Sequence, residues 1–348
     1  MITVLIVEDS PSAAELLRYL IEGDPEMQVV GIARDGLEGV TAVRLQKPDV
    51  IIMDIIMPRM DGFEATRRIM EATPTPIVIT SASWNPGEVE KTFRALESGA
   101  LAIVAKPMGK GHADFDRNAR ELVATVKLMS EIKVVRRRSY SPGTRPQGTV
   151  PAAMPRTAPA DIALVAIVAS TGGPPVLHTI LSGLGEDFPV PVLIVQHIAP
   201  GFTRGFVEWL AKASGFPVRL AVHGERPLPG QAYVAPDDHH LGVDAHGRLV
   251  LSQAAPMNGL RPAGSYLFHS VAQFLGRRAV GVLLTGMGKD GAQELKEMRD
   301  RGALTLVQDQ ASAIVYGMPG EAARIGAATQ VLPPDKIASL LAQLIRNK

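Results

Sequence analysis

Three polar residues in the C-terminal half of the chain each lie just past a strand-like apolar run. Ser170 stands between such a run and a glycine turn, and His197 and Asp290 come after two further runs. The three runs are 162–169, 192–195 and 282–284. A serine hydroxyl becomes a useful nucleophile when an imidazole, itself oriented by a carboxylate, accepts its proton. If these strand ends converge, the three residues predict a serine-type hydrolytic site.

The stretch Thr285–Gly291 around Asp290 is rich in glycine. Attack on a carbonyl places negative charge on its oxygen, and exposed backbone amides of such a loop can stabilise that charge. Taken singly, Ser170 could cap a helix and His197 could be a polar strand end. A general lipase-like hydrolase is disfavoured, because no G-x-S-x-G elbow surrounds Ser170.

A second polar group, Asp237–Asp238–His239–His240, has the residue types of a metal site. Adjacent residues of a hairpin point to opposite faces, and no further ligand lies at a suitable spacing. We therefore expect no metal there, and no cofactor in the hydrolytic site.

The N-terminal half carries a different cluster, again at strand ends. Glu8 and Asp9 end a first strand, Asp54 a third, Ser81 a fourth, and Lys106 follows a fifth. In a flavodoxin-like order 2-1-3-4-5 the first and third strands are neighbours, so the three carboxylates would crowd together. Their oxygens suit Mg²⁺, which would relieve the repulsion between them. Asp54 could then attack a phosphoryl donor, with Lys106 and Ser81 binding its oxygens.

Composition limits the remaining possibilities. The 348 residues are 46% hydrophobic, carry a formal charge of +1 and include no cysteine, which excludes thiol chemistry and gives no overall attraction to nucleic acid. No apolar run approaches the roughly 20 residues of a membrane span, and Glu8 and Asp9 interrupt any signal sequence. We expect a cytoplasmic protein without membrane insertion.

Alternating strand and helix patterns in both halves predict two doubly wound α/β domains. We expect an N-terminal domain over residues 1–126, a linker rich in proline and arginine over 127–160, and a C-terminal domain over 161–348. In the second domain, an inserted antiparallel hairpin is predicted from three short runs. These runs are 231–234, 241–243 and 248–251.

Residues 1–126 resemble a two-component receiver domain. The matching motifs are Glu8–Asp9, Asp54, Met57–Pro58, Asp61–Gly62, Ser81 and Lys106–Pro107. The resemblance implies phosphorylation of Asp54 by a histidine kinase. It also implies Mg²⁺ held by Asp9, Asp54 and the backbone carbonyl of Ile56, with Glu8 acting through water and Ser81 and Lys106 forming the switch. Ile103 departs from the pattern, because receivers commonly have Tyr or Phe there.

From Asp161 to Val331 the chain resembles the catalytic domain of the chemotaxis protein-glutamate methylesterases, which are themselves receiver–linker–esterase proteins. The matching motifs are Ala169–Gly173, Val195–His197, Pro200–Thr203, Tyr233–Pro236, Leu267–Val271 and Thr285–Ala292. The resemblance implies Ser170 as nucleophile, His197 as base, Asp290 as orienting acid and the Met287 amide as oxyanion donor, with Thr171 assisting. The departures are Ala263, Ser265 and Lys289.

Together the two resemblances predict a phosphorylation-regulated esterase. It would hydrolyse glutamyl methyl esters on the cytoplasmic helices of chemoreceptors to glutamate and methanol, and would also deamidate receptor glutamines. Two alternatives remain at this point. One is a catalytically silent docking protein, and the other is a transcriptional regulator, which the absence of a basic helix-turn-helix pattern disfavours.

Overall fold

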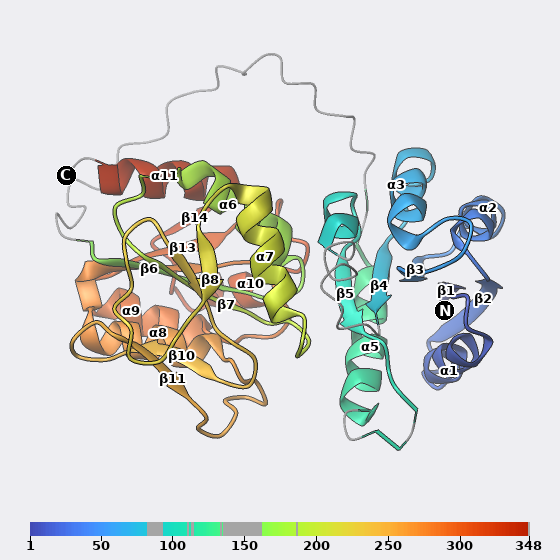
Figure 1. Ribbon diagram of the computed structural model, residues 1–348, viewed down its shortest axis with the longest axis horizontal. Coiled ribbons are helices and arrows are strands. Elements are labelled where there is room, and N and C mark those ends of the chain that lie inside the picture. The colour runs from blue at the N-terminus through green and yellow to red at the C-terminus, as the bar shows by residue number, and fades with distance from the viewer. Residues whose placement is uncertain are drawn as a thin grey trace, which may run out of the picture.

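Two α/β lobes, each built on its own parallel sheet, make up the molecule (Figure 1). The computed structural model describes residues 1–81, 93–109, 111–112, 115–132, 134, 162–185 and 187–346. The predicted fold class, two doubly wound domains, is confirmed. The predicted linker over 127–160 falls largely outside the described residues. No helix in the described ranges combines the length and the apolar composition that crossing a bilayer requires.

The N-terminal sheet has the strand order β2-β1-β3-β4-β5, as predicted from the chain pattern. Its strands are β1 (Ile2–Val7), β2 (Met27–Ala33), β3 (Val50–Asp54), β4 (Ile77–Ser81) and β5 (Ala102–Ala105). The helices with defined bounds are α1 (Pro11–Glu22), α2 (Gly36–Gln46), α3 (Gly62–Ala72) and α5 (Phe115–Ser130), and residues 93–97 are also helical. Side chains fix where the first three helices begin, since Ser10, Asp35 and Asp61 each accept a hydrogen bond from a first-turn amide.

The C-terminal sheet has seven parallel strands in the order β14-β13-β12-β6-β7-β9-β8. Its strands are β6 (Leu164–Ala169), β7 (Val192–Gln196), β8 (Val218–Leu220), β9 (Ala232–Val234), β12 (Ala279–Leu283), β13 (Leu304–Gln308) and β14 (Gln330–Leu332). Its helices are α6 (Gly173–Leu184), α7 (Thr203–Ser214), α8 (Gly264–Phe274), the 3-10 helix η1 (Gly276–Arg278), α9 (Ala292–Asp300), α10 (Met318–Arg324) and α11 (Pro334–Arg346). The three central strands, β12, β6 and β7, are buried along their whole length.

The predicted hairpin is partly wrong. β10 (His240–Val243) and β11 (Leu249–Ser252) do form an antiparallel pair. The first of the three runs forms β9 instead, which pairs in parallel with β7 and β8 in the main sheet. All three residues of β9 are buried, which is typical of a strand that has a parallel neighbour on each side.

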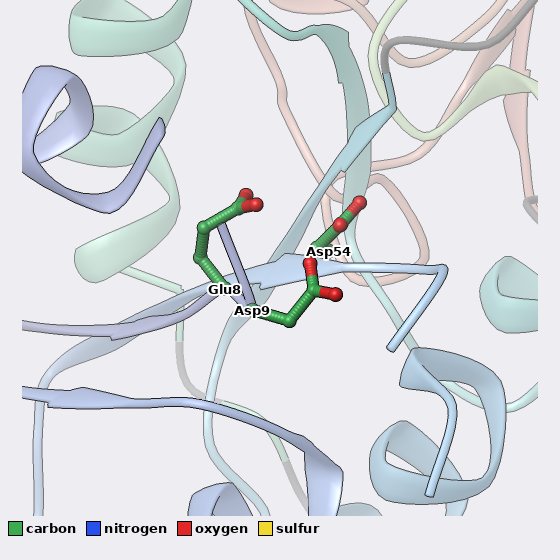
Figure 2. A group of neighbouring side chains, drawn as sticks. All are labelled: Glu8, Asp9 and Asp54. Atoms are coloured by element: carbon green, nitrogen blue, oxygen red, sulfur yellow. The ribbon is translucent and has the colours of Figure 1, made fainter. Parts of the chain in front are cut away.

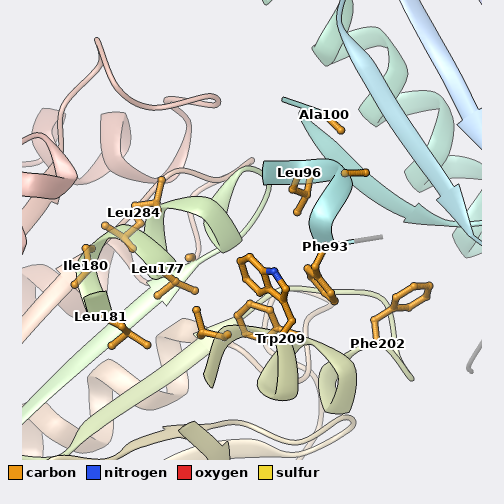
Figure 3. Packing of buried hydrophobic residues seen from close by; sticks show 14 of the residues in the cluster. Phe93, Leu96, Ala100, Leu177, Ile180, Leu181, Phe202, Trp209 and Leu284 are labelled. Carbon is orange, nitrogen blue, oxygen red and sulfur yellow. The ribbon is translucent and has the colours of Figure 1, made fainter. Parts of the chain in front are cut away.

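An aromatic cluster joins the two lobes (Figure 3). Phe93, from the helical segment 93–97, stacks on Trp209 of α7 with ring centroids 5.2 Å apart and lies 5.5 Å from the ring of Phe206. The Trp209 Nε1–H also donates a hydrogen bond to Glu97 Oε1 across the boundary, at 3.0 Å. All three rings are buried, so the lobes share a packed apolar contact.

Gly62, the first residue of α3, lies against the backbone of Asp54. A Cβ atom at this position would stand 2.0 Å from the Asp54 carbonyl oxygen. We expect Gly62→Ala to lower the free energy of unfolding of the N-terminal domain by about 1–3 kcal/mol, because backbone must move to admit the methyl group. Chemical denaturation measures the change. Gly109→Ala is the control, since a Cβ there meets nothing within 4 Å; equal effects of the two substitutions would contradict the prediction.

Candidate active site and phosphorylation site

The three residues of the predicted hydrolytic site leave three adjacent strands. Ser170 directly follows β6, His197 directly follows β7, and Asp290 lies in the loop after β12. The backbone ties these ends together, because His197 N–H donates to the Ala169 carbonyl at 2.9 Å and Ser170 N–H donates to the Thr285 carbonyl at 3.0 Å. The sheet therefore presents a hydroxyl, an imidazole and a carboxylate at one edge.

His197 and Asp290 meet directly. The Nε2 atom of His197 lies 3.0 Å from Asp290 Oδ2, and the two side chains are 11% and 3% exposed. The contact has the distance of an ion pair, while the N–H direction falls short of hydrogen-bond alignment. With Nε2 turned to the carboxylate, Nδ1 is the ring nitrogen left to accept a proton.

The Asp290 carboxylate is anchored at the start of α8. Gly264 N–H donates to Oδ2 at 2.5 Å and Ser265 N–H donates to Oδ1 at 3.1 Å. Burial alone raises the pKa of Asp290, but the contacts with His197, Ser265 and Gly264 outweigh it and hold that pKa below its ordinary value. The carboxylate is therefore ionised at neutral pH and can orient the imidazole. These two amides were not predicted from the sequence.

The glycine loop packs tightly beneath Ser170. A Cβ on Gly286 would stand 2.7 Å from the Ser170 Cβ and 2.4 Å from Met318 Sδ, so only glycine fits there without displacing a neighbour. Gly288 has a φ of 82°, which also favours glycine. Met287 lies between them with 40% of its surface exposed. The role of its amide as an oxyanion donor stays a prediction.

A cleft of about 480 Å³ lies between the two lobes at this edge. From the C-terminal lobe it is lined by residues that include Ser170, Thr171, His197, Arg261 and Met287. From the N-terminal lobe it is lined by residues that include Leu101, Ile103, Glu121 and Thr125. Desolvation there raises the pKa of the Glu121 carboxyl on α5. The N-terminal lobe therefore faces the candidate active site directly.

The carboxylates of the N-terminal cluster come together as expected. Glu8, Asp9 and Asp54 each offer an oxygen, and these atoms lie within 4.8 Å of one another (Figure 2). Glu8 and Asp54 are buried, at 1% and 7% exposure, and Asp9 is exposed. Hard oxygen donors at this spacing fit a divalent cation such as Mg²⁺. Ile56 lies two residues past Asp54, and the role predicted for its carbonyl stays a prediction.

Lys106 neutralises part of this cluster. Its Nζ lies 2.8 Å from Glu8 Oε2 and 3.1 Å from Asp54 Oδ2. Burial raises the pKa of both carboxyls, and the Lys106 cation offsets that rise only in part. Burial alone lowers the pKa of Lys106, but the two carboxylates raise it overall. Ser81, which is 5% exposed, ends β4 beside this group, and its carbonyl accepts a hydrogen bond from Lys106 N–H.

Known proteins share both halves of this arrangement. Residues 4–113 match the response regulator receiver domain, and residues 165–341 match the CheB methylesterase domain. The chain is 54% identical to protein-glutamate methylesterase/protein-glutamine glutaminase 1 of Syntrophus aciditrophicus over 99% of this chain and 98% of that protein. It belongs to the CheB methylesterase family. The family resemblance predicted from the motifs is confirmed.

Further relatives agree. A protein-glutamate methylesterase/protein-glutamine glutaminase of Nitrosospira multiformis is 51% identical over the whole of this chain and 98% of its own length. The crystal structure of the Thermotoga maritima CheB methylesterase catalytic domain is 36% identical and matches with a TM-score of 0.52. The match covers 53% of this chain and 100% of the Thermotoga maritima catalytic domain.

Two of the three positions that depart from the family motifs, Ala263 and Ser265, make hydrogen bonds near the site. Ser265 Oγ donates to Glu294 at 2.7 Å and accepts from Gly291 N–H at 3.1 Å, so it braces the loop that carries Asp290. Ala263 N–H donates to His240 Nδ1 at 3.2 Å. Lys289 is exposed.

The group 237–240 organises loops around the site. Asp237 accepts hydrogen bonds from Gly201 N–H and from the Thr203 hydroxyl at the start of α7. Asp238 pairs with Arg261 at 2.6 Å. Among the described residues, the group with the spacing of a metal site is the one in the N-terminal lobe. The expectation of no metal at 237–240 stays a prediction.

His240 is fully buried and stacks on Tyr266 with ring centroids 4.8 Å apart. Its Nδ1 accepts from Ala263 N–H and its Nε2 lies 3.2 Å from the Ala255 carbonyl, which fits a neutral ring protonated on Nε2. Burial lowers the pKa of His240, and the Arg261 cation adds to this effect. The Ala255 carbonyl and the Asp290 carboxylate act in the opposite direction.

The free energy of unfolding should therefore fall as the pH drops below 6.5, the ordinary value for this group. In that window the unfolded chain binds a proton that the native ring does not, whereas above it the full contribution is present. We expect His240→Asn, which keeps an acceptor for Ala263, to flatten the pH profile of stability measured by denaturation between about pH 5 and 7.5. His246→Asn, at an exposed turn, should keep the original slope. A profile as steep in His240→Asn as in the unmodified protein would refute the assignment.

Proposed function

We propose that this chain is a serine hydrolase that cleaves glutamyl methyl esters on chemoreceptor helices, with Ser170 as nucleophile, His197 as base and Asp290 as orienting acid. The observation that carries the proposal is the contact between the buried side chains of His197 and Asp290, because His197 lines the same cleft as Ser170. The activity printed in the names of the full-length relatives supports the choice of substrate. The boundaries proposed for its parts are 1–126, 127–160 and 161–348.

The reaction follows from these positions. Ser170 Oγ attacks the ester carbonyl carbon while His197 takes the hydroxyl proton, and the negative oxygen that forms is stabilised by the Met287 amide. The carbon–oxygen bond to the methoxy group then breaks, and His197 returns the proton so that methanol leaves. Water attacks the acyl-enzyme by the same route and restores Ser170, leaving glutamate. A glutamine side chain presents the same carbonyl, with ammonia as the leaving group.

Asp54 is proposed as the phosphorylation site, with a histidine kinase as the donor. Asp9, Asp54 and the backbone carbonyl of Ile56 would hold Mg²⁺, with Glu8 acting through water, because two buried carboxylates with raised pKa values and one exposed carboxylate converge there. When bound, the cation supplies charge neutralisation for phosphoryl transfer. Lys106 supplies part of that neutralisation from the protein itself, and it is placed to contact a phosphoryl group on Asp54.

Regulation is proposed to act through the cleft. Ile103 and Glu121 of the N-terminal lobe line the same cleft as Ser170, so this lobe covers part of the approach to the proposed nucleophile. We propose that this is the resting state, held by the Phe93–Trp209 contact, and that phosphorylation of Asp54 shifts the population toward an open state.

Ser170→Ala should abolish methanol release from methylated receptor, with a loss of about 10³-fold or more, because the imidazole has no hydroxyl left to activate. Ser339→Ala, an exposed hydroxyl on α11, should behave like the unmodified protein. A serine-reactive phosphonate should label the unmodified protein and leave Ser170→Ala unlabelled. Full methanol release by Ser170→Ala would overturn the assignment of Ser170 as nucleophile, whereas failure of the phosphonate to label the unmodified protein would favour the silent docking alternative.

Trp209→Ala should raise the basal rate of the unphosphorylated protein about two- to tenfold, because an aromatic contact contributes about 0.5–1.5 kcal/mol beyond its buried area. The further activation by a phosphodonor should shrink accordingly. Phe216→Leu provides the control, since the ring of Phe216 packs against Phe188 of the same lobe. A folded Trp209→Ala protein with an unchanged basal rate would rule out a restraining contact at this point.

A further inference from the structure

Gln196, the last residue of β7, links the backbones of the two residues proposed to react. Its side chain is 4% exposed, and its Nε2 donates to the Ser170 carbonyl at 2.9 Å and to the His197 carbonyl at 2.8 Å. The ordinary strand ladder between β6 and β7 ends here, with Ala169 paired to Gln196 and a last bond from His197 N–H to Ala169. Beyond this point the two chains separate, and one amide group spans them.

The other end of the same side chain is left without a partner. Gln196 Oε1 is buried and accepts no hydrogen bond from any described residue. It faces Gly173 at the start of α6, where a Cβ would stand only 2.2 Å from it. A buried acceptor without a donor is costly, so this oxygen offsets part of the stability that the two donated hydrogen bonds supply. Glycine at 173 is the residue that leaves room for this amide.

We infer that Gln196 is a positioning residue, which fixes the spacing between the nucleophile and the base by holding both carbonyls with one NH₂ group. The inference rests on the proposed function of Ser170 and His197. Small displacements of reacting groups slow catalysis strongly, and a shift of about 1 Å can lower the rate about 10²-fold. Loss of the amide should therefore act on the chemical step and leave substrate binding nearly unchanged.

The test compares kcat and KM for methanol release by the full chain. Gln196→Met keeps the length of the side chain and removes both donors, and we expect kcat to fall about 10- to 100-fold with KM changed less than about threefold. The free energy of unfolding should change little, because removal of the unpaired oxygen offsets part of the loss of the two hydrogen bonds to the Ser170 and His197 carbonyls. Gly173→Ala is a second variant that keeps Gln196 and displaces its amide, and kcat should fall there too.

Two controls separate positioning from general strain. Gly183→Ala crowds the same helix against Ala338, where a Cβ would stand 2.7 Å from the Ala338 Cβ, and should lower stability without lowering kcat. Thr305→Val removes a buried hydrogen bond to the Ala327 carbonyl, outside the site. If Gln196→Met and Gly173→Ala both keep kcat within about twofold of these controls, the inference is wrong. Activity surviving in Ser170→Ala would instead overturn the proposed function, so the two failures are distinguishable.

Discussion

A carboxylate removed from water is stable only where charges or hydrogen-bond donors replace its hydration, and each lobe of this protein holds such a group where its parallel strands end. Asp290 is buried in this way in the C-terminal lobe, at 4% exposure, and Asp54 is buried beside Glu8 in the N-terminal lobe, at 7%. The neighbours of each carboxylate determine what it can do. Much of the surrounding loop structure supplies those neighbours.

The two carboxyls are shifted in opposite directions. Burial raises the pKa of Asp290, but its contacts with His197, Ser265 and Gly264 outweigh burial and lower that pKa overall, so the group stays charged and can orient His197. Asp54 is met by one lysine and is close to Asp9 and Glu8, and burial raises its pKa. Its charge is thus incompletely balanced, which suits a group proposed to bind a cation and to attack phosphorus. The contrast is physical support for assigning different chemistry to the two aspartates.

Sequence reasoning located the strand ends well, because buried parallel strands are continuous apolar runs and their carboxyl ends meet at one sheet edge. The same rule predicts that Ser170, His197 and Asp290 lie near one another, and each does follow one of three adjacent strands. It could not identify the amides of Gly264 and Ser265, since the direction of a backbone N–H depends on how α8 packs. The run 231–234, expected in the hairpin, forms β9 of the main sheet for a similar reason. The apolar character of a short strand does not show which strand it pairs with.

The contact between the lobes could not be predicted from the sequence, although the sequence does show an apolar face on α7. Phe206 and Trp209 lie three positions apart on α7, which indicates one buried helix face but not the surface that covers it. The covering surface comes from the other lobe and includes Phe93. An apolar helix face predicts that the face is buried. The structure is needed to show that, in α7, the other lobe covers it.

Strand β5 is the element that belongs to both sites. Lys106, which directly follows it, contacts Asp54, while Leu101 and Ile103 of the same segment line the cleft opposite Ser170. A change in charge at Asp54 therefore acts on a lysine only three residues from a side chain that faces the active site. Because Ile103 is aliphatic, no aromatic ring is available at this position to change rotamer between a buried and an exposed place. In the proposed regulation, coupling through this segment would act by movement of β5 and of the helical segment 93–97, whose Phe93 is stacked against Trp209. The packing of Phe93 on Trp209 would then transmit a charge change at Asp54 to the cleft between the lobes.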